Sequence, residues 1–240
     1  MQDVETASGI LLDDVRLTLG GNEFHFDCHL LGGQTTAVTG PSGSGKSTLL
    51  NLISGFETPD SGRIFHGERD ITDLHPAERP VSLVFQDNNL FAHLDIFTNV
   101  GLGINPSLRL TGPDRQAVSN ALARVGLEGM EKRMPATLSG GERQRAAFAR
   151  AMVRQRPVLL MDEPFAALDP GLRQAMAAIF AELHQASRNT VLIVTHDPDE
   201  VRRLATNVIF IEDGTIALQA KTEDFLSRND IPAIAEFLRG

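Results

Sequence analysis

The stretch Gly40-Pro-Ser-Gly-Ser-Gly-Lys-Ser-Thr48 constrains the fold of this 240-residue chain more than any other feature. It matches G-x-x-x-x-G-K-[ST], in which glycines let backbone N–H groups turn inward around a phosphate and the lysine adds positive charge. The apolar run Thr35–Thr39 precedes the stretch, and a helical pattern over Lys46–Ile53 follows it. The pattern therefore predicts a strand–loop–helix unit that binds phosphate at the N-terminus of the helix, and the alternative is a chance Gly/Ser-rich turn.

Short apolar runs alternate with helical patterns along the rest of the chain. Runs of four to six apolar residues bounded by Gly, Pro or charge are typical of strands buried on both faces, and alternation with helices favours a mainly parallel sheet. The first 35 residues and the stretch 62–67 indicate shorter antiparallel elements. Together these patterns predict an α/β fold with a P-loop NTPase core. The expected strands are 35–39, 81–85, 158–161, 191–195 and 208–211, and the expected helices include 114–125 and 173–186.

The stretch 88–155 contains helical periodicity but no strand pattern, so we expect a helical subdomain inserted between two strands of the sheet. The resulting organisation is a single domain over residues 1–240. Its nucleotide-binding core comprises 1–87 and 156–225, its helical subdomain 88–155, and its C-terminal tail 226–240.

Composition excludes several classes of protein. The formal net charge of −9 disfavours nucleic acid as a partner. Cys28 is the single cysteine, so we expect a small buried residue and neither an internal disulfide nor a thiolate metal cluster. The N-terminus has no signal-peptide pattern and no apolar run reaches the length of a membrane span, so we expect contact with a membrane to go through a partner.

Two adjacent carboxylates, Asp162 and Glu163, follow the apolar run Val158–Met161. An Asp at such a strand end can hold Mg²⁺, and a Glu directly after it can deprotonate the water that attacks a γ-phosphate. The alternative is a charge pair that precedes a helix.

Four of the expected strands end on polar groups. In a parallel α/β sheet, ligands bind beyond the carboxyl ends of the strands. We therefore expect the phosphate loop, Gln86, Asp162, Glu163 and His196 to converge on one crevice. Taken singly, Gln86 has the alternative of a surface amide, and His196 that of a surface or core histidine.

A second glycine-rich motif, Leu138-Ser-Gly-Gly-Glu-Arg-Gln-Arg145, opens a helical run that extends to Arg154. A helix N-terminus with exposed backbone donors is a second possible phosphate site, and a plain glycine-rich N-cap is the alternative.

The whole set, in this order along the chain, resembles the nucleotide-binding subunit of an ATP-binding cassette transporter over residues 12–220. The resemblance implies ATP and Mg²⁺ as cofactors and a head-to-tail dimer with two shared ATP sites. It implies Glu163 as the general base, with Gln86 and His196 as further catalytic residues, and Ser47, Gln86 and Asp162 as the Mg²⁺ site. The implied nucleotide contacts are Gly40, Pro41, Ser42, Gly43, Ser44, Gly45, Lys46, Ser47 and Thr48 from one subunit and Ser139, Gly140 and Gly141 from the other, with Asp169 bridging the two.

The segment 79–94, running on to Pro106, resembles more closely the ATP-binding subunits of bacterial thiamine importers. That implies a permease partner, a periplasmic receptor behind it, and a peripheral location on the cytoplasmic face of the inner membrane. Alternatives are an importer ATPase for another solute, a cassette ATPase that acts on nucleic acid or ribosomes, and a small-molecule kinase. Segment 88–94 is the expected contact with the permease, with Leu90 and Phe91 as apolar contacts or as ordinary core residues.

The chain contains 13 Phe but no Tyr or Trp. The resemblance implies an aromatic residue, most often Tyr, that stacks on adenine before the phosphate loop. Spacing places Leu17 or Leu19 there, with Phe24 the nearest aromatic side chain. We therefore predict weak discrimination between ATP and GTP.

Overall fold

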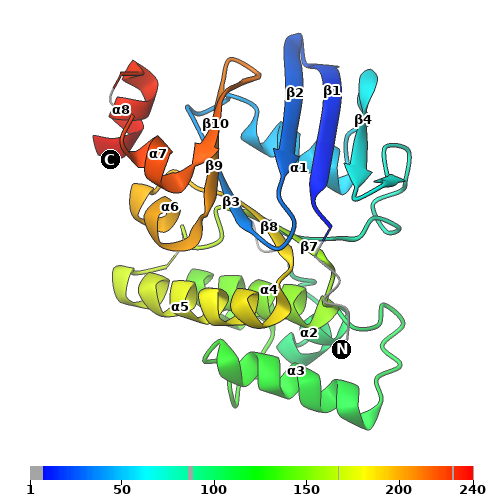
Figure 1. Cartoon of the computed structure of the whole chain (residues 1–240). Helices are drawn as coiled ribbons and strands as arrows, with labels where there is room; N and C mark the ends of the chain where they lie inside the picture. Colours follow the sequence, from blue (N-terminus) through cyan, green and yellow to red (C-terminus); the bar gives the residue numbers. More distant parts are fainter. Residues whose placement is uncertain (1–7, 86–88, 167, 229, 240) are drawn as a thin grey trace, which may run out of the picture. The chain divides into compact units, whose positions relative to one another are not determined.

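The computed structural model describes residues 8–85, 89–166, 168–228 and 230–239 (Figure 1). These residues form two compact units. The first contains residues up to Val81 together with Pro157–Asp162 and the chain from Ser187 onward. The second contains Ser82–Arg156 and Glu163–Ala186. Gln86 lies outside the described residues, so its expected position is not tested.

A mixed sheet forms the centre of the first unit (Figure 1). Its strands follow the order β5-β4-β1-β2-β10-β9-β3-β8-β7. In that order they are Arg69–Asp70, Ser61–His66, Ile10–Leu19, Asn22–Leu30, Thr215–Lys221, Asn207–Glu212, Thr35–Thr39, Thr190–Val194 and Val158–Asp162. β6, Val81–Val84, begins in this unit and continues into the second.

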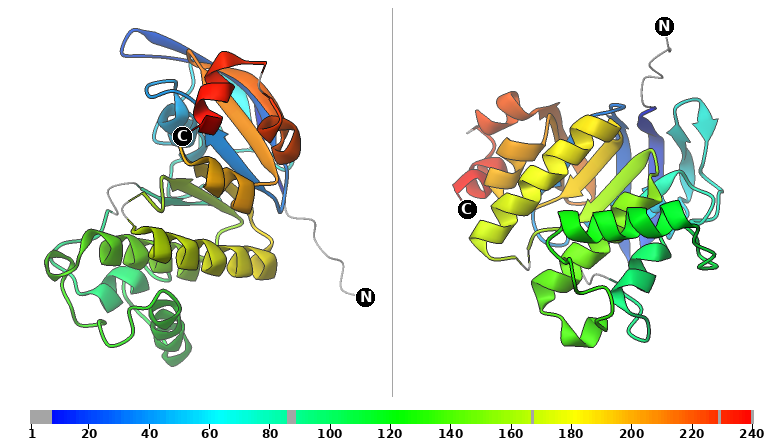
Figure 2. Two further views of the ribbon diagram at one scale, coloured as in Figure 1. Left: turned by 90° about the vertical axis from the view of Figure 1, so that its left-hand side faces the viewer. Right: turned by 90° about the horizontal axis from the view of Figure 1, so that it is seen from below.

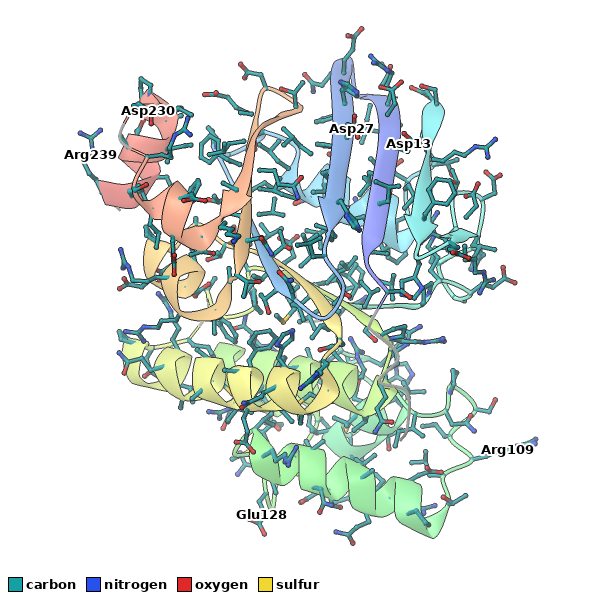
Figure 3. All side chains as sticks on the ribbon, in the orientation of Figure 1. Asp13, Asp27, Arg109, Glu128, Asp230 and Arg239 are labelled. Atoms are coloured by element: carbon teal, nitrogen blue, oxygen red, sulfur yellow. The ribbon has the colours of Figure 1, made fainter. Side chains whose placement is uncertain are left out.

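The strands β9, β3, β8 and β7 run parallel and make up the apolar core of the sheet. Every residue of β3 and of β8 is buried, as expected for strands covered on both faces. The first strands behave differently: β1 pairs antiparallel with β2 and β4, and buried residues alternate with exposed ones. In Figure 3, Asp13 on β1 and Asp27 on β2 point away from the sheet, whereas their neighbours Leu12 and Phe26 are buried. The predicted α/β fold with a mainly parallel core and antiparallel strands is thus confirmed.

The described residues of the first unit include the helices α1 (Lys46–Ser54), α6 (Pro198–Leu204), α7 (Thr222–Leu226) and α8 (Pro232–Arg239). α1 contacts β7, and α7 packs on β9 and β10 (Figures 1 and 2). The rings of Phe210, Phe225 and Phe237 contact one another in series and tie β9, α7 and α8 together. Cys28 is buried, as predicted, and burial raises the pKa of its thiol to about 12.

Arg79 is fully buried in the first unit, where it caps the end of α1. Its guanidinium donates hydrogen bonds to the main-chain oxygens of Leu52, Ile53, Thr72 and Leu74, at 2.6–3.0 Å. Leu52 and Ile53 lie in the last turn of α1, where the carbonyls have no partner within the helix. This arginine therefore joins the loop before β6 to the helix that follows the phosphate loop.

The second unit is helical and contains α2 (Ile96–Gly101), α3 (Gly112–Arg124), the 3-10 turn Pro135–Thr137, α4 (Gly140–Arg154) and α5 (Pro170–Ser187, of which Ser187 falls in the first unit). α2 and α3 both contact α4, and Phe148 of α4 meets Phe180 of α5 with ring centroids 6.4 Å apart. Thr111 and Asp114 form a reciprocal cap at the start of α3, so the helix predicted over 114–125 begins slightly earlier.

Candidate functional site

The phosphate loop connects β3 to α1 in the first unit, as predicted. Two of its glycines have positive φ in places where no side chain fits. A Cβ at Gly40 would lie 2.0 Å from the main-chain oxygen of Ile211, and a Cβ at Gly45 would lie 2.8 Å from the ring of Phe24. At Ser44, the main-chain oxygen accepts a hydrogen bond from the N–H of Gly214 at 3.1 Å. The loop therefore rests on β2 and on the β9–β10 turn.

Lys46 is the first residue of α1, directly after the left-handed Gly45. Its ammonium group donates hydrogen bonds to the main-chain oxygens of Gly40 and Pro41, at 2.9 and 2.7 Å. These bonds hold the positive charge over the loop at the N-terminal end of α1. Positive charge and the helix dipole at this point both favour an anion such as phosphate.

Three of the expected strand ends lie at one edge of the sheet. Val38 of β3 pairs with Val194 of β8, and Val194 pairs in turn with Asp162 of β7. Because these neighbouring strands are parallel, the phosphate loop, His196 and Asp162 all follow the same edge. The Oγ of Ser47 lies 3.5 Å from Oδ2 of Asp162, although the two residues are 115 positions apart in the chain.

Hydrogen bonds of a buried residue hold the loop that follows β8. Thr195 is buried, and its hydroxyl donates to Oε2 of Glu200 at 2.6 Å. The hydroxyl oxygen of Thr195 also accepts the N–H of Asp197 at 3.1 Å, and Asp197 caps α6. His196 sits between these two anchored residues with an exposed side chain. The loop therefore presents His196 outward at the phosphate-loop edge of the sheet.

Glu163 is the first residue of the Glu163–Ala186 segment of the second unit, and its backbone is left-handed, with φ 46°. For a residue with a Cβ this conformation costs about 1–2 kcal/mol. Its main-chain oxygen accepts hydrogen bonds from Ala166 N–H at 3.3 Å and from the amide of Gln144 at 3.1 Å. These bonds hold the backbone in the strained conformation.

Ser139 is the N-cap of α4. Its hydroxyl accepts the N–H of Glu142 at 3.2 Å, and the Glu142 carboxylate accepts the N–H of Ser139 at 2.7 Å. These bonds hold the pKa of the Glu142 carboxyl below its usual value. Asp169 caps the start of α5 as Ser139 caps α4: its Oδ1 accepts the N–H of Leu172 at 3.0 Å. Gly140 and Gly141 form the first turn of α4, so this motif presents backbone N–H groups at a capped helix start.

The three candidates for the adenine platform differ sharply in exposure. Leu17 and Phe24 pair across β1 and β2 and are 6% and 8% exposed, whereas Leu19 at the end of β1 is 39% exposed. Only Leu19 of the three thus offers an accessible face for stacking. Phe24 instead packs under Gly45 and beside Phe26, with ring centroids 6.2 Å apart.

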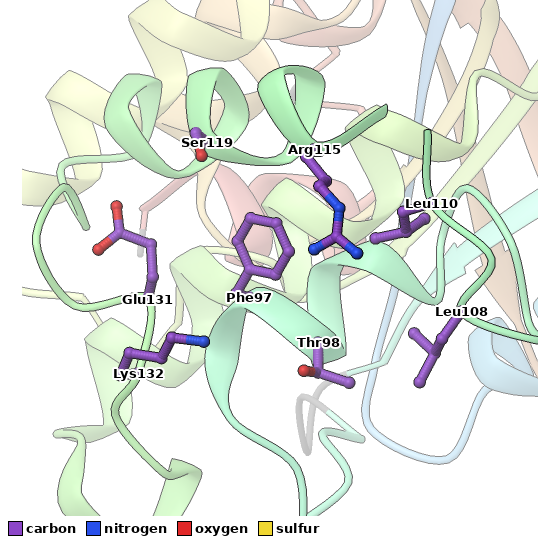
Figure 4. Close-up of a pocket in the computed structure, with 8 residues that line it drawn as sticks. All are labelled: Phe97, Thr98, Leu108, Leu110, Arg115, Ser119, Glu131 and Lys132. Carbon is purple, nitrogen blue, oxygen red and sulfur yellow. The ribbon is translucent and has the colours of Figure 1, made fainter. Parts of the chain in front are cut away.

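A cavity of about 450 Å³ opens in the second unit (Figure 4). The ring of Phe97 lines it, with Arg115 on one side of the ring and Glu131 and Lys132 on the other (Figure 4). The remaining lining residues are Thr98, Leu108, Leu110 and Ser119. None of the described residues predicted to bind nucleotide or metal lines this cavity.

Comparison with known proteins identifies the family. A family model described as ABC transporter matches residues 24–166, which include the phosphate loop, the 138–145 motif and Glu163. The chain belongs to the ABC transporter family. ABC cassettes of transporters are ATP hydrolases, so this chain binds and hydrolyses ATP. No helix among the described residues is long and apolar enough to cross a membrane.

Curated ABC relatives cover nearly the whole chain. The protein named "Thiamine import ATP-binding protein ThiQ" from Rhizobium meliloti is 52% identical over 97% of this chain and 98% of its own length. The protein of the same name from Brucella suis is 53% identical over 97% of each chain. The similarity is therefore not limited to the phosphate-binding core.

Solved ABC cassettes have the same fold. The cassette MJ0796, in a dimeric post-hydrolysis state bound to ADP and Pi, superposes with a TM-score of 0.80 at 29% identity, over 89% of this chain and 98% of that one. A second dimeric structure of MJ0796 gives the same TM-score at 30% identity and the same coverage. The predicted resemblance to this family is confirmed.

Two residues that the structure makes prominent were not among the sequence predictions. Gln144 stands within the recognised 138–145 motif, but no local pattern indicates that its side chain reaches Glu163. Asn99 is fully buried and binds the main chain of the 91–95 loop. Its position as a polar residue on the apolar face of a short helix is the sequence signal that could have indicated this role.

Proposed function

We propose that this chain is the ATP-binding and ATP-hydrolysing subunit of a membrane importer for thiamine. The observation that carries the proposal is the 52–53% identity, over 97% of the chain, with proteins named as thiamine import ATP-binding proteins. The phosphate loop, the Ser47–Asp162 pair and the capped α4 motif supply the chemistry that this function needs.

Residues 40–48 hold the phosphates of ATP in this proposal. Backbone N–H groups of the loop and the ammonium of Lys46 face the anion. Ser47 and Asp162 fit Mg²⁺, because a hydroxyl and a carboxylate 3.5 Å apart are the hard oxygen ligands that this ion prefers. The ion, with Gln86 as a further ligand, would neutralise charge on the β- and γ-phosphates.

Glu163 acts as general base. Its carboxylate takes a proton from water while the water oxygen bonds to the γ-phosphorus, the bond to the bridging oxygen breaks, and ADP leaves. His196 holds the γ-phosphate and Gln86 orients the water. General-base help of this kind contributes roughly 10²–10⁴ to the rate.

Two copies of the chain form a head-to-tail dimer. Each ATP lies between the phosphate loop of one copy and Ser139, Gly140 and Gly141 of the other, with Asp169 at the dimer contact. The dimeric state of the MJ0796 cassette and the capped N-terminus of α4 support this arrangement. Backbone N–H groups at that helix start would complete the phosphate site.

A permease is the partner in the membrane, with a periplasmic receptor behind it, and this chain is peripheral on the cytoplasmic face of the inner membrane. The 91–95 loop supports the permease contact. Asn99 bonds to both the N–H and the oxygen of Phe91, at 2.8 and 3.1 Å, and Phe91 as a residue is nevertheless 48% exposed. A fixed backbone that presents an exposed aromatic side chain is suited to an interface.

The function is tested in the complex reconstituted with its permease. ATP hydrolysis should rise when the receptor carries thiamine. Glu163→Gln should abolish hydrolysis and leave ATP bound, whereas Lys46→Ala should weaken ATP binding itself. A response to another solute, but not to thiamine, would assign the importer to that solute. Hydrolysis at the wild-type rate in Glu163→Gln would remove Glu163 as the base.

A further inference from the structure

Gln144 is a buried polar residue that reaches the catalytic segment. It lies in the second turn of α4, its side chain is 2% exposed, and its Nε2 donates a hydrogen bond to the main-chain oxygen of Glu163 at 3.1 Å. Both residues belong to the second unit. The bond therefore connects the start of α4 with the residue proposed as general base, 19 positions away in the chain.

The carbonyl that Gln144 binds has a particular place in the backbone. Glu163 has φ 46°, a left-handed conformation that L-residues rarely adopt without support. The same carbonyl accepts the N–H of Ala166 at 3.3 Å and closes the turn that leads toward Asp169. Pro164 and Phe165 within this turn are buried, so the surrounding chain is fixed. The direction of the Glu163 Cα–Cβ bond depends on this strained conformation, since the backbone angles set it.

Packing alone does not account for Gln144. Its Oε1 is buried and has no hydrogen-bond partner among the described residues, which is unfavourable for a polar atom. A leucine or methionine would fill the same space without that cost. The group that distinguishes glutamine from them here is the N–H that reaches Glu163.

We propose that Gln144 is a positioning residue for Glu163, holding its backbone in the conformation that aims the carboxylate at the attacking water. The inference rests on the proposed function, in which Glu163 is the base. Ser139, which caps the same helix, contacts the ATP of the opposite site in that proposal. In each copy, Gln144 therefore connects two groups. One is the start of α4, which contacts the ATP of the partner's site, and the other is Glu163, which acts on the ATP of the copy's own site.

The test uses the complete transporter with Gln144→Leu, which removes the donor, and Gln144→Met, which does so with a flexible chain of similar length. Both should lower kcat for ATP by about 10- to 100-fold, since small misplacements of reacting groups cost rates of this order. KM and the affinity for ATP should change by less than about threefold, because the phosphate loop is untouched. Gln185 on α5 is exposed, and Gln185→Leu is the matched control that should behave as wild type.

Gln144→Glu gives a readout that a packing role would not produce. The ionised carboxylate has the same shape as the amide but cannot donate, so kcat should be low at neutral pH. The protonated carboxyl donates an O–H, and burial beside a carbonyl raises its pKa. The ratio of variant to wild-type kcat should therefore rise as pH falls, whereas the ratio for Gln144→Leu should stay flat.

A double variant separates this inference from the proposed function. Added to Glu163→Gln, Gln144→Leu should lower the residual hydrolysis no further, because both changes act through one group. A kcat within twofold of wild type in Gln144→Leu, or a loss of ATP affinity without a fall in kcat, overturns the inference. If Glu163→Gln itself retains the wild-type rate, the proposed function fails at its base, whatever Gln144 does.

Discussion

The ring of Phe24 occupies the space into which a side chain on Gly45 would project. A Cβ at Gly45 would lie 2.8 Å from Cδ1 and 2.9 Å from Cε1 of that ring. Gly45 also has φ 108°, so both the backbone and the space around it require glycine. The Phe24 ring on β2 therefore packs against the phosphate loop at Gly45 and supports it.

Phe24→Leu should therefore weaken binding of the phosphates, whichever nucleobase the ligand carries. The smaller side chain leaves the loop unsupported beneath Gly45, so affinity for ATP, GTP and inorganic tripolyphosphate should fall by one common factor, about 3- to 10-fold. Titration of each ligand measures this. Phe56→Leu, at a ring that is 54% exposed, is the control. A loss confined to ATP would mean that Phe24 contacts adenine.

The exposed Leu19 leads to the opposite expectation. Leu19→Tyr supplies an aromatic face at the end of β1, and base stacking on such faces contributes about 1–3 kcal/mol. ATP affinity should rise about 5- to 10-fold, and tripolyphosphate affinity should not change. Leu11→Tyr is the matched control, because Leu11 lies on the same strand and is 38% exposed. Equal gains in the two variants would remove Leu19 as the platform.

Local patterns in the sequence were sufficient for the parallel core. Continuous apolar runs and a glycine-rich turn predict β3, β7 and β8 nearly to their ends, because strands buried on both faces have little freedom in composition. β10 was missed, because its exposed and half-buried residues alternate and form no apolar run, although it pairs antiparallel with the neighbouring strand β9 across the Asp213–Gly214 turn.

The exposure and contacts of individual side chains could not be predicted from the sequence. Spacing alone placed Leu17 or Leu19 at the platform, with Phe24 as the nearest aromatic side chain, and did not decide between them. All three lie on one face of the β1–β2 pair, because Leu17 and Leu19 are two residues apart and Phe24 pairs with Leu17. Leu19 is exposed because it lies at the end of β1. Likewise, no spacing rule brings Gln144 to Glu163, because that contact depends on how the start of α4 packs on the 163–166 turn.

Arg79→Met should destabilise the protein by about 3 kcal/mol. The change removes a charged donor from four main-chain oxygens, two of them at the end of α1, although the Leu52 oxygen still accepts the N–H of Gly55 at 3.3 Å. Chemical denaturation measures the free energy of unfolding. Arg69→Met removes an exposed guanidinium nearby and should change it by less than about 0.5 kcal/mol. Similar losses in both variants would contradict the capping role of Arg79.

Phe91→Ser should uncouple hydrolysis from the receptor. The ring is exposed although its backbone is fixed, so its removal should leave basal hydrolysis by the isolated chain unchanged. In the reconstituted complex, stimulation by the loaded receptor should fall about tenfold, since a buried aromatic anchor contributes strongly to an interface. Phe56→Ser removes another exposed ring as control. Full stimulation in Phe91→Ser would place the permease contact elsewhere.

Cys28 should make stability depend on pH in the alkaline range. Burial raises the pKa of its thiol from 9.0 to about 12 in the folded state. Above pH 9 the unfolded chain therefore binds fewer protons than the folded one, and the free energy of unfolding falls as pH rises, by up to about 1.4 kcal/mol per pH unit from this group. Cys28→Ala should remove that part of the slope, measured by denaturation between pH 8 and about 11.

The same burial should protect the thiol from alkylation. At pH 8 the thiolate fraction falls from about one in ten for an ordinary thiol to about one in 10⁴, so Cys28 should react with iodoacetamide only after unfolding. Because the chain has no Tyr, the ultraviolet absorbance of the thiolate can be followed without a tyrosinate band. Rapid labelling of the folded protein, or a thiolate signal near pH 9, would show that this strand opens readily and that Cys28 is not held in the core of the β1–β2 pair.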